Sequence, residues 1–206
     1  MKKKQISNII FPNKKINYFT ATIIILGIIS GSVFLISLNP TDKTAVIDQI
    51  KTFISNINNN KINSGLALKN SLLINYIFIG LIFCLGLSMI GIIVNVFLTY
   101  IRGFIIGFSL SSMILTYSYK GIVIAALYAF PVQLLNLFSV WAITTYSIMF
   151  SKNLLAMIMN QKKNSTNNLK KYFVILIICI ITSFLASVIE SYLFPNILKT
   201  VIGIYI

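Results

Sequence analysis

Few side chains in this chain could carry covalent or metal chemistry. The 206 residues include no histidine and only three carboxylates, Asp42, Asp48 and Glu190. A zinc or two-metal site therefore lacks a ligand set, and neither a Ser/His/Asp nor a Cys/His arrangement can form. No G-x-x-x-x-G-K-[ST] sequence occurs, so no phosphate-binding loop is indicated. We expect a protein that is not an enzyme and that holds no metal or cofactor.

Polar residues inside apolar segments are the other place where function could reside, because such residues are costly in a bilayer. Pro131 bends its helix and frees carbonyls, which Gln133 and Asn136 could satisfy; alternatively these residues line a cavity. Glu190 could meet water, pair with a lysine or act inside the membrane. Arg102, the only arginine, is expected at a cytoplasmic turn, with a buried charge in a pore or interface as the alternative.

The composition indicates the solvent in which these residues lie. The chain is 57% hydrophobic and 10% charged, whereas soluble domains are about 45–50% apolar and about 25% charged. Lipid must therefore surround much of the chain. The lysines behind the net charge of +14 fall between apolar runs, which indicates lipid head groups rather than nucleic acid as their partner. We expect one integral membrane domain over residues 1–206, all-α and polytopic.

Five segments are apolar enough to serve as transmembrane helices, which need about 20 residues each. The second and third are expected to join at Tyr100–Gly103, which offers an interfacial aromatic, a cation and a glycine. Residues 196–206 are expected to form a short helix that is either interfacial or tucked inward. The expected spans are Tyr18–Leu38, Leu72–Thr99, Gly103–Tyr117, Gly121–Phe150 and Tyr172–Phe194.

The segment between the first two spans, residues 39–70, is comparatively polar and contains an amphipathic pattern. Pro40 and Asp42 suit a helix start, since an acid is favourable near the positive end of a helix. The apolar residues then recur on one helical face, which we expect to lie on the membrane surface or on a partner. This face contains Val46, Ile47, Ile50, Phe53, Ile54 and Ile57.

The distribution of charge predicts the orientation. With a cytoplasmic N-terminus, five spans place the basic residues 1–17, Arg102 and the Lys/Asn-rich connector 151–171 inside. That side then holds eleven cations and no acid, against six cations and all three acids outside. Because cytoplasmic loops carry an excess of Lys and Arg, we expect this orientation, with residues 39–70 outside the cell.

Small residues recur at the spacing of helix-packing motifs. Gly27 with Gly31, and Gly103 with Gly107, are both G-x-x-x-G, and Ser111 extends the second face. Such faces allow close approach of helices in lipid. They could pack within one bundle, or they could form a partner or homodimer interface.

Four sequence motifs in a fixed order carry a family resemblance. After a Lys-rich start, one span and the amphipathic loop come GLSMIG (Gly86–Gly91), RGFIIGF (Arg102–Phe108), KGIVIAAL…FPVQLL (Lys120–Leu135) and ASVIESYLFP (Ala186–Pro195). This order resembles the stage II sporulation protein M family of endospore-forming bacteria, over nearly the whole chain.

The resemblance implies a role in engulfment, in which the mother-cell membrane migrates around the forespore. Members of this family are membrane components of a complex with stage II sporulation proteins D and P, which are peptidoglycan hydrolases. The resemblance thus implies a scaffold in the septal membrane that recruits or positions these enzymes. The alternative is a transporter or channel subunit with a polar path near Pro131, Gln133, Asn136 and Glu190.

Overall fold

The fold is a bundle of long helices. A computed structural model of the chain describes residues 13–59, 61–88, 90–159 and 165–205, and within these ranges the regular structure is helical, without strands. The expected all-α fold is confirmed. Residues 1–12 of the basic N-terminus and 160–164 of the connector lie outside the described residues. The helices are α2 (Lys14–Ser37), α3 (Pro40–Asn58), α4 (Ser64–Gly86), α5 (Gly91–Tyr128), η1 (Ala129–Gln133), α6 (Leu134–Ile158), α7 (Ser165–Val188), η2 (Ile189–Leu193) and α8 (Phe194–Tyr205).

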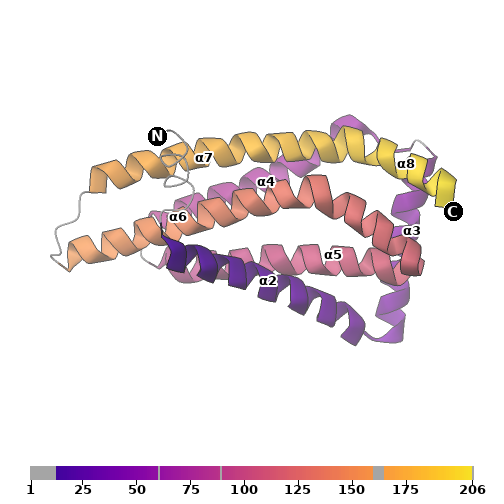
Figure 1. Cartoon of the computed structure of the whole chain (residues 1–206), viewed down its shortest axis with the longest axis horizontal. Helices are drawn as coiled ribbons and strands as arrows, with labels where there is room; N and C mark the ends of the chain where they lie inside the picture. The colour runs from indigo at the N-terminus through magenta and orange to yellow at the C-terminus, as the bar shows by residue number, and fades with distance from the viewer. Residues whose placement is uncertain (1–12, 60, 89, 160–164, 206) are drawn as a thin grey trace.

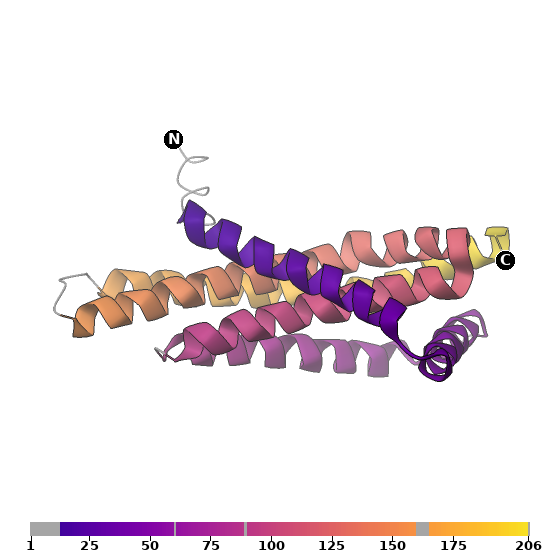
Figure 2. The same ribbon diagram turned by 90° about the horizontal axis from the view of Figure 1, so that it is seen from below.

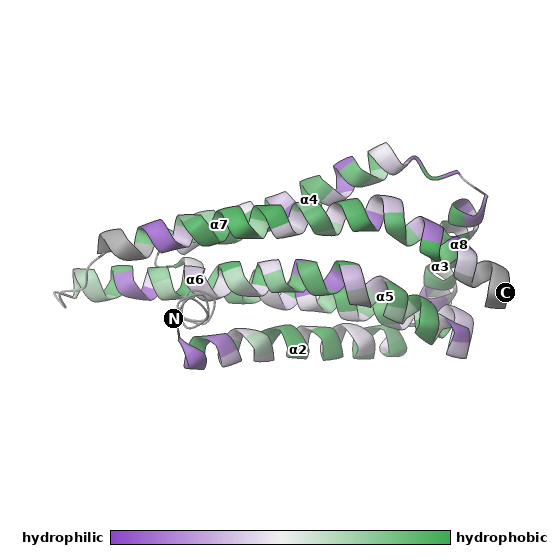
Figure 3. Cartoon of the chain, turned by 45° about the horizontal axis from the view of Figure 1, so that its top comes forward, coloured by the Kyte–Doolittle hydropathy of each residue, from purple (hydrophilic) through white to green (hydrophobic). Residues whose placement is uncertain are grey.

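The long helices run side by side, and α3 lies across one end of them (Figures 1 and 2). Hydrophobic residues follow the long helices along their length, and hydrophilic residues gather toward the helix ends (Figure 3). Many large apolar side chains on the outer surface are exposed, among them Ile25, Ile29 and Ile36 of α2. Water would penalise such a surface, whereas lipid does not. Among the residues that the structure describes, four helical segments are long and apolar enough to cross a membrane.

One of these four segments, Gly91–Met157, folds back on itself. Ser118 interrupts α5 with φ 51° and ψ −127°, a backbone region that non-glycine residues rarely adopt. Gly121 permits the tight reversal, because a Cβ there would collide with the carbonyl oxygen of Met113. The chain then returns through η1 into α6, so this segment passes along the bundle twice (Figure 2). The reversal at Ser118 lies between the expected spans Gly103–Tyr117 and Gly121–Phe150.

The turn that was expected at Tyr100–Gly103 is not there, and that prediction is wrong. α4 ends at Gly86 and α5 begins at Gly91, so the turn lies in the GLSMIG motif and α5 runs uninterrupted through Arg102. Gly91 makes this turn possible, because a Cβ there would collide with the backbone of Leu85. The expected bounds Leu72–Thr99 and Gly103–Tyr117 are corrected accordingly.

Gly103 instead allows α2 and α5 to pack closely. A Cβ on Gly27 would collide with the carbonyl of Tyr100, and one on Gly103 would lie 2.5 Å from the carbonyl of Ile24. Gly31 and Gly107 make equivalent contacts one turn further along. The two G-x-x-x-G motifs therefore face each other within one chain, as small residues do at close helix crossings in lipid. Ser111, on the same helix, is half-buried.

The helix α3 confirms the expected amphipathic helix, and its apolar face packs against the bundle. Ile54 and Ile57 are buried in a cluster with Met113, Ile124, Ala125, Phe194 and Leu198. Ile50 is partly buried against this cluster, Val46 and Ile47 are half-buried, and Phe53 is 39% exposed. Much of the face that we expected to meet the membrane surface or a partner therefore contacts the chain's own helices.

The last helical segment is longer than expected. α7, η2 and α8 follow one another without a break from Ser165 to Tyr205, where a separate helix, either interfacial or tucked inward, was expected to begin at residue 196. Leu198 of α8 is fully buried in the cluster beneath α3. α8 therefore helps to hold α3 at that end of the bundle.

Candidate functional site

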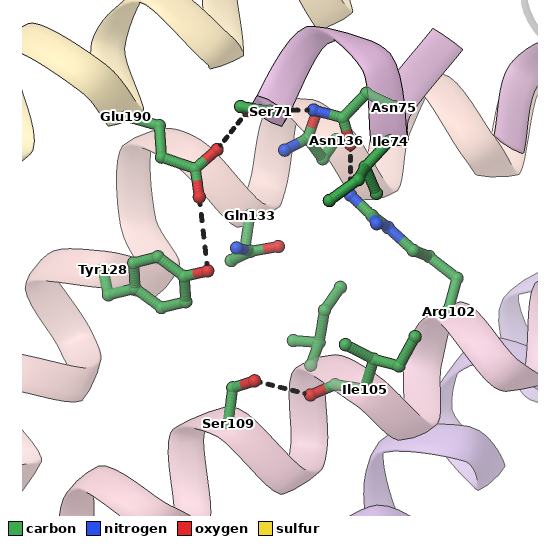
Figure 4. A pocket seen from close by; sticks show the side chains of 11 residues that line it. Ser71, Ile74, Asn75, Arg102, Ile105, Ser109, Tyr128, Gln133, Asn136 and Glu190 are labelled. Carbon is green, nitrogen blue, oxygen red and sulfur yellow. Dashed lines mark hydrogen bonds between the residues drawn. The ribbon is translucent and has the colours of Figure 1, made fainter. Parts of the chain in front are cut away.

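A polar cavity lies inside the bundle. It has a volume of about 180 Å³ and lies between α4, α5, η1, α6 and η2 (Figure 4). Its walls combine two opposite charges with hydroxyl, phenol and amide groups, a composition unlike that of the surrounding apolar core. The lining residues are Ser71, Ile74, Asn75, Arg102, Ile105, Ile106, Ser109, Tyr128, Gln133, Asn136 and Glu190.

Arg102 is buried in the middle of α5, with 7% of its surface exposed. Its Nη2 donates a hydrogen bond of 2.6 Å to Asn75 Oδ1, and its guanidinium carbon lies 5.4 Å from the centre of the Phe78 ring. Its Nε has no hydrogen-bond partner among the described atoms. An arginine at a helix centre costs about 2.5–3.5 kcal/mol to insert in a bilayer. These neighbours offset part of that cost, so the buried-charge alternative describes Arg102.

A chain of neutral side chains joins Arg102 to Glu190. Asn75 Nδ2 donates to Ser187 Oγ at 3.2 Å and to Ser71 Oγ at 3.4 Å. Ser71 Oγ donates to Glu190 Oε2 at 2.6 Å (Figure 4). Among the described residues, no ion pair joins Arg102 and Glu190 directly. The two charges therefore lie on different walls of one cavity and are linked by hydrogen bonds through an amide and a hydroxyl.

The two π-helical turns shape the wall around Glu190 and Gln133. In η1 the Leu134 N–H bonds the carbonyl of Ala129, and in η2 the Phe194 N–H bonds the carbonyl of Ile189. Each bond spans five residues, so the helix widens locally without breaking. Pro131 lies inside η1, so the span that it was expected to bend continues through this wider turn. Single π-turns inside α-helices are frequent at functional sites.

The remaining polar groups of the cavity are only partly satisfied. Glu190 Oε1 accepts a hydrogen bond of 3.4 Å from the Tyr128 hydroxyl. Gln133 and Asn136 are 6% and 2% exposed. Gln133 Oε1 and Asn136 Oδ1 have no hydrogen-bond partner among the described atoms. An unpaired buried polar atom costs about 1–3 kcal/mol, so these two amide oxygens, which are shielded from the open part of the cavity, are a local cost to the bundle.

An apolar cavity of about 330 Å³ adjoins the polar one beneath α3. Both are lined by Ser71, Ile74, Ser109, Tyr128 and Glu190. The apolar cavity adds Ile50, Phe53 and Ile57 of α3, together with Phe194 and Pro195. The amphipathic helix therefore covers an apolar space that leads to the charged groups.

A second group of buried polar residues lies further along the bundle and joins helices to one another. Thr20 and Thr145 are 3.0 Å apart through their hydroxyls, and Thr99 and Thr144 are 2.8 Å apart. Asn95 donates to the carbonyl of Ile82 at 3.1 Å. Such pairs are typical of interhelical contacts in membrane proteins. We interpret this group as packing rather than as a binding site.

Sequence reasoning identified Arg102, Gln133, Asn136 and Glu190 separately, and the structure brings all four to one cavity. It missed Ser71, Asn75, Ser109, Tyr128 and Ser187. A signal was available: on α5, Asn95, Thr99, Arg102 and Ser109 follow at i, i+4, i+7 and i+14, which is one helical face. A polar stripe at this spacing in an apolar helix predicts a face that points into a bundle.

The cavity offers paired charges and hydrogen-bonding groups to a polar molecule. Within the described ranges, no three His, Cys, Asp or Glu residues come together as a metal site would need. The fold and the cavity define a class: a multi-pass helical membrane protein with a charged internal site.

The family follows from a direct comparison. The family model described as stage II sporulation protein M matches residues 20–195, which cover nearly the whole bundle from α2 to the start of α8. The chain therefore belongs to the stage II sporulation protein M family, and it is a membrane protein of a sporulation family. Comparisons with curated proteins and with solved structures found no match.

Proposed function

We propose that this chain is a non-enzymatic membrane scaffold that recruits or positions the peptidoglycan hydrolases known as stage II sporulation proteins D and P. In this proposal it acts in septal wall degradation and forespore engulfment, in the mother-cell membrane at the septum. The observation that carries the proposal is the family match over residues 20–195. The scarcity of catalytic side chains, with no histidine and three carboxylates, is consistent with a partner that does the cutting.

The outward part of α3 is the surface we propose for the hydrolases, which act on the wall outside the membrane. Ile54 and Ile57 are buried in the bundle, so a partner would meet the opposite face of α3. That face exposes Asp48, Gln49 and Lys51, which are hydrophilic and free of the apolar contacts that hold the helix. The charge distribution, with a cytoplasmic N-terminus, would put this face outside the cell.

Deletion of the gene in the spore-forming host tests the cellular role. During induced sporulation, with a membrane dye as the readout, we expect arrest at a flat or bulging septum, and rescue by the wild-type gene. Normal engulfment in the deletion strain would overturn the proposal.

Site-specific crosslinking tests the surface. A photoreactive residue at Gln49 should capture a D- or P-type hydrolase in sporulating cells. The same residue at Asn153, near the end of α6 far from α3, is the control and should capture neither. Capture from both positions, or from Asn153 alone, would contradict the proposed surface.

The cavity favours a second candidate function, a transporter or channel subunit. Gln133, Asn136 and Glu190 line one polar cavity with Arg102, as expected for a path through a bundle. A flux assay in proteoliposomes should then show a solute leak that Glu190→Gln and Gln133→Leu change. Equal impermeability of wild type and both variants removes this candidate for the solutes tested.

A further inference from the structure

We propose that the polar cavity binds a small zwitterion, with the acid group on Arg102 and a primary ammonium group on Glu190. The ligand class is a molecule that carries an ammonium and a carboxylate or phosphate a few bonds apart. This proposal rests on the geometry of the cavity and not on hydrolase recruitment.

The arrangement of the two charges is the first argument. Arg102 and Glu190 both line the cavity, and the side chains that connect them, Asn75 and Ser71, are neutral. Inside a bilayer the attraction between opposite charges is strong because the surroundings screen poorly. A ligand that places an anionic group beside Arg102 and a cationic group beside Glu190 would form an ion pair with each side chain at once.

The charged groups that line the walls match such a ligand at both ends. The Arg102 guanidinium donates hydrogen bonds, which an acid group accepts. The Glu190 carboxylate accepts hydrogen bonds, and a primary ammonium brings three donors. A simple anion would satisfy Arg102 but would be repelled by Glu190, and a simple cation would meet the reverse problem. The charge balance of the site therefore favours a zwitterion over either ion.

The size of the cavity sets the size of the polar group. A volume of about 180 Å³ exceeds the share of one water molecule, roughly 30 Å³, by enough to admit an amino acid or a lipid head group. It is too small for a nucleotide, which needs a pocket in the upper part of the usual range of about 300–1,000 Å³.

The neighbouring apolar cavity leaves two sources open for this chemistry. An ethanolamine phospholipid could place its head group between Arg102 and Glu190, and the cavity of about 330 Å³ beneath Phe53 and Ile57 of α3 would hold only a short apolar part of the same molecule. A free amino acid would use the polar cavity alone. Both present a primary ammonium and an acid group, and the experiment separates them.

The full chain, reconstituted in nanodiscs, provides the test. One arm measures lipid retention by native mass spectrometry from equal mixtures of phosphatidylethanolamine, phosphatidylcholine and phosphatidylglycerol. The other arm measures binding of radiolabelled glycine, alanine and glycine betaine in phosphatidylcholine nanodiscs by scintillation proximity. Phosphatidylcholine and betaine are the matched controls, since their quaternary ammonium has no N–H to donate.

We expect a primary-ammonium zwitterion to bind in one of the two arms, about tenfold more tightly than its quaternary counterpart. Glu190→Gln and Asn136→Leu should each weaken binding by about tenfold. Ser30→Ala, which removes a polar group on α2 outside the cavity, should leave it unchanged. Size-exclusion chromatography and thermal unfolding establish that each variant is folded, and Asn136→Leu tests the site without altering its charge.

Equal retention of all three lipids together with no binding of glycine or alanine by folded wild type would overturn the proposal, and would leave a cavity that holds water only. Full binding by both cavity variants would overturn it as well. None of these results bears on septal arrest or hydrolase capture, so this proposal and the scaffold proposal fail separately.

Discussion

At the scale of single residues, the main feature is a pair of opposite charges held apart in one internal cavity. Arg102 bonds Asn75, and Glu190 accepts hydrogen bonds from Ser71 and Tyr128. Arg102 is buried and Glu190 is half-buried, and the two opposite charges together keep the cavity electrically neutral. Loss of one charge leaves the other uncompensated in surroundings of low polarity.

This dependence predicts that substitutions of the two residues will not be additive. Arg102→Met and Glu190→Gln should each lower stability, and the double variant should be more stable than the sum of the single effects by about 0.5–3 kcal/mol. The measurement is a double-mutant cycle by thermal or SDS unfolding in detergent micelles.

Lys152→Met is the matched control for this cycle, because Lys152 is an exposed cation at the far end of α6. Its effect should add to that of Glu190→Gln within about 0.3–0.5 kcal/mol. Additivity of Arg102→Met with Glu190→Gln as well would show that the two charges act independently.

At the scale of the elements, two contacts organise the bundle: the crossing of α2 on α5 and the docking of α3. The crossing depends on glycines because each backbone approaches the other more closely than a Cβ would allow. The docking depends on buried isoleucines, because α3 is otherwise polar and offers few other contacts to the bundle.

Alanine at the crossing should therefore destabilise the bundle. Gly27→Ala and Gly103→Ala force a Cβ against backbone atoms that cannot rotate away, and we expect each to cost about 1–3 kcal/mol, the usual cost of overpacking. Gly80→Ala is the control on α4, because a Cβ there meets nothing within 4 Å. It should stay within about 0.5 kcal/mol of wild type. Equal unfolding midpoints for all three variants would be inconsistent with the close crossing.

Truncation of the buried Ile57 side chain, which packs α3 against the bundle, should loosen this helix while leaving the bundle folded. Ile57 is 1% exposed, and Ile57→Ala should cost about 2–5 kcal/mol of local stability. Trypsin cleavage after Lys51 should then become faster, with Ile47→Ala, at a half-buried position, as the milder control. If cleavage is as slow as in wild type, α3 does not depend on this contact.

At the scale of the whole molecule, the path of the chain decides which segments share a side of the membrane. The end of α4, the start of α5 and the end of α6 lie toward one end of the bundle, whereas α3 and the reversal from α5 through η1 into α6 lie at the other (Figures 1 and 2). Because the turn lies between α4 and α5, Arg102 belongs to a membrane-spanning helix and not to a loop. The corrected turn leaves ten cations on the expected cytoplasmic side, against six on the other, so the charge bias retains its direction.

Cysteine labelling in spheroplasts should report this path. After replacement of Cys84 and Cys179 by serine, Ser88→Cys and Asn153→Cys should react with a membrane-impermeant maleimide from one side, and Thr52→Cys and Ser118→Cys from the other. Ile101→Cys should stay unlabelled, because it lies within a span. Labelling of Ile101→Cys without Ser88→Cys would restore the turn that was expected beside Arg102.

The sequence by itself determined the class of fold, the membrane environment, the amphipathic helix and the family. These follow from local quantities: the apolar length that crosses a bilayer, the 3.6-residue period of a helical face and an ordered set of short motifs. The first two are evaluated within a window of about 20 residues, and the order of the motifs is evaluated along the chain, so none requires knowledge of which helices are neighbours.

Only the tertiary structure decided where Arg102 lies and what surrounds it. In a hydropathy profile, a lone arginine indicates the end of a span. The residues that stabilise Arg102 do not enter such a profile, because they are far away in sequence: Asn75 is on another helix, and Glu190 lies beyond α7. The same holds for Gly103, which could serve a turn or a close crossing until α2 is in place against it. A buried charge is compensated by neighbours in space, and that is why the site became visible only when the helices were packed together.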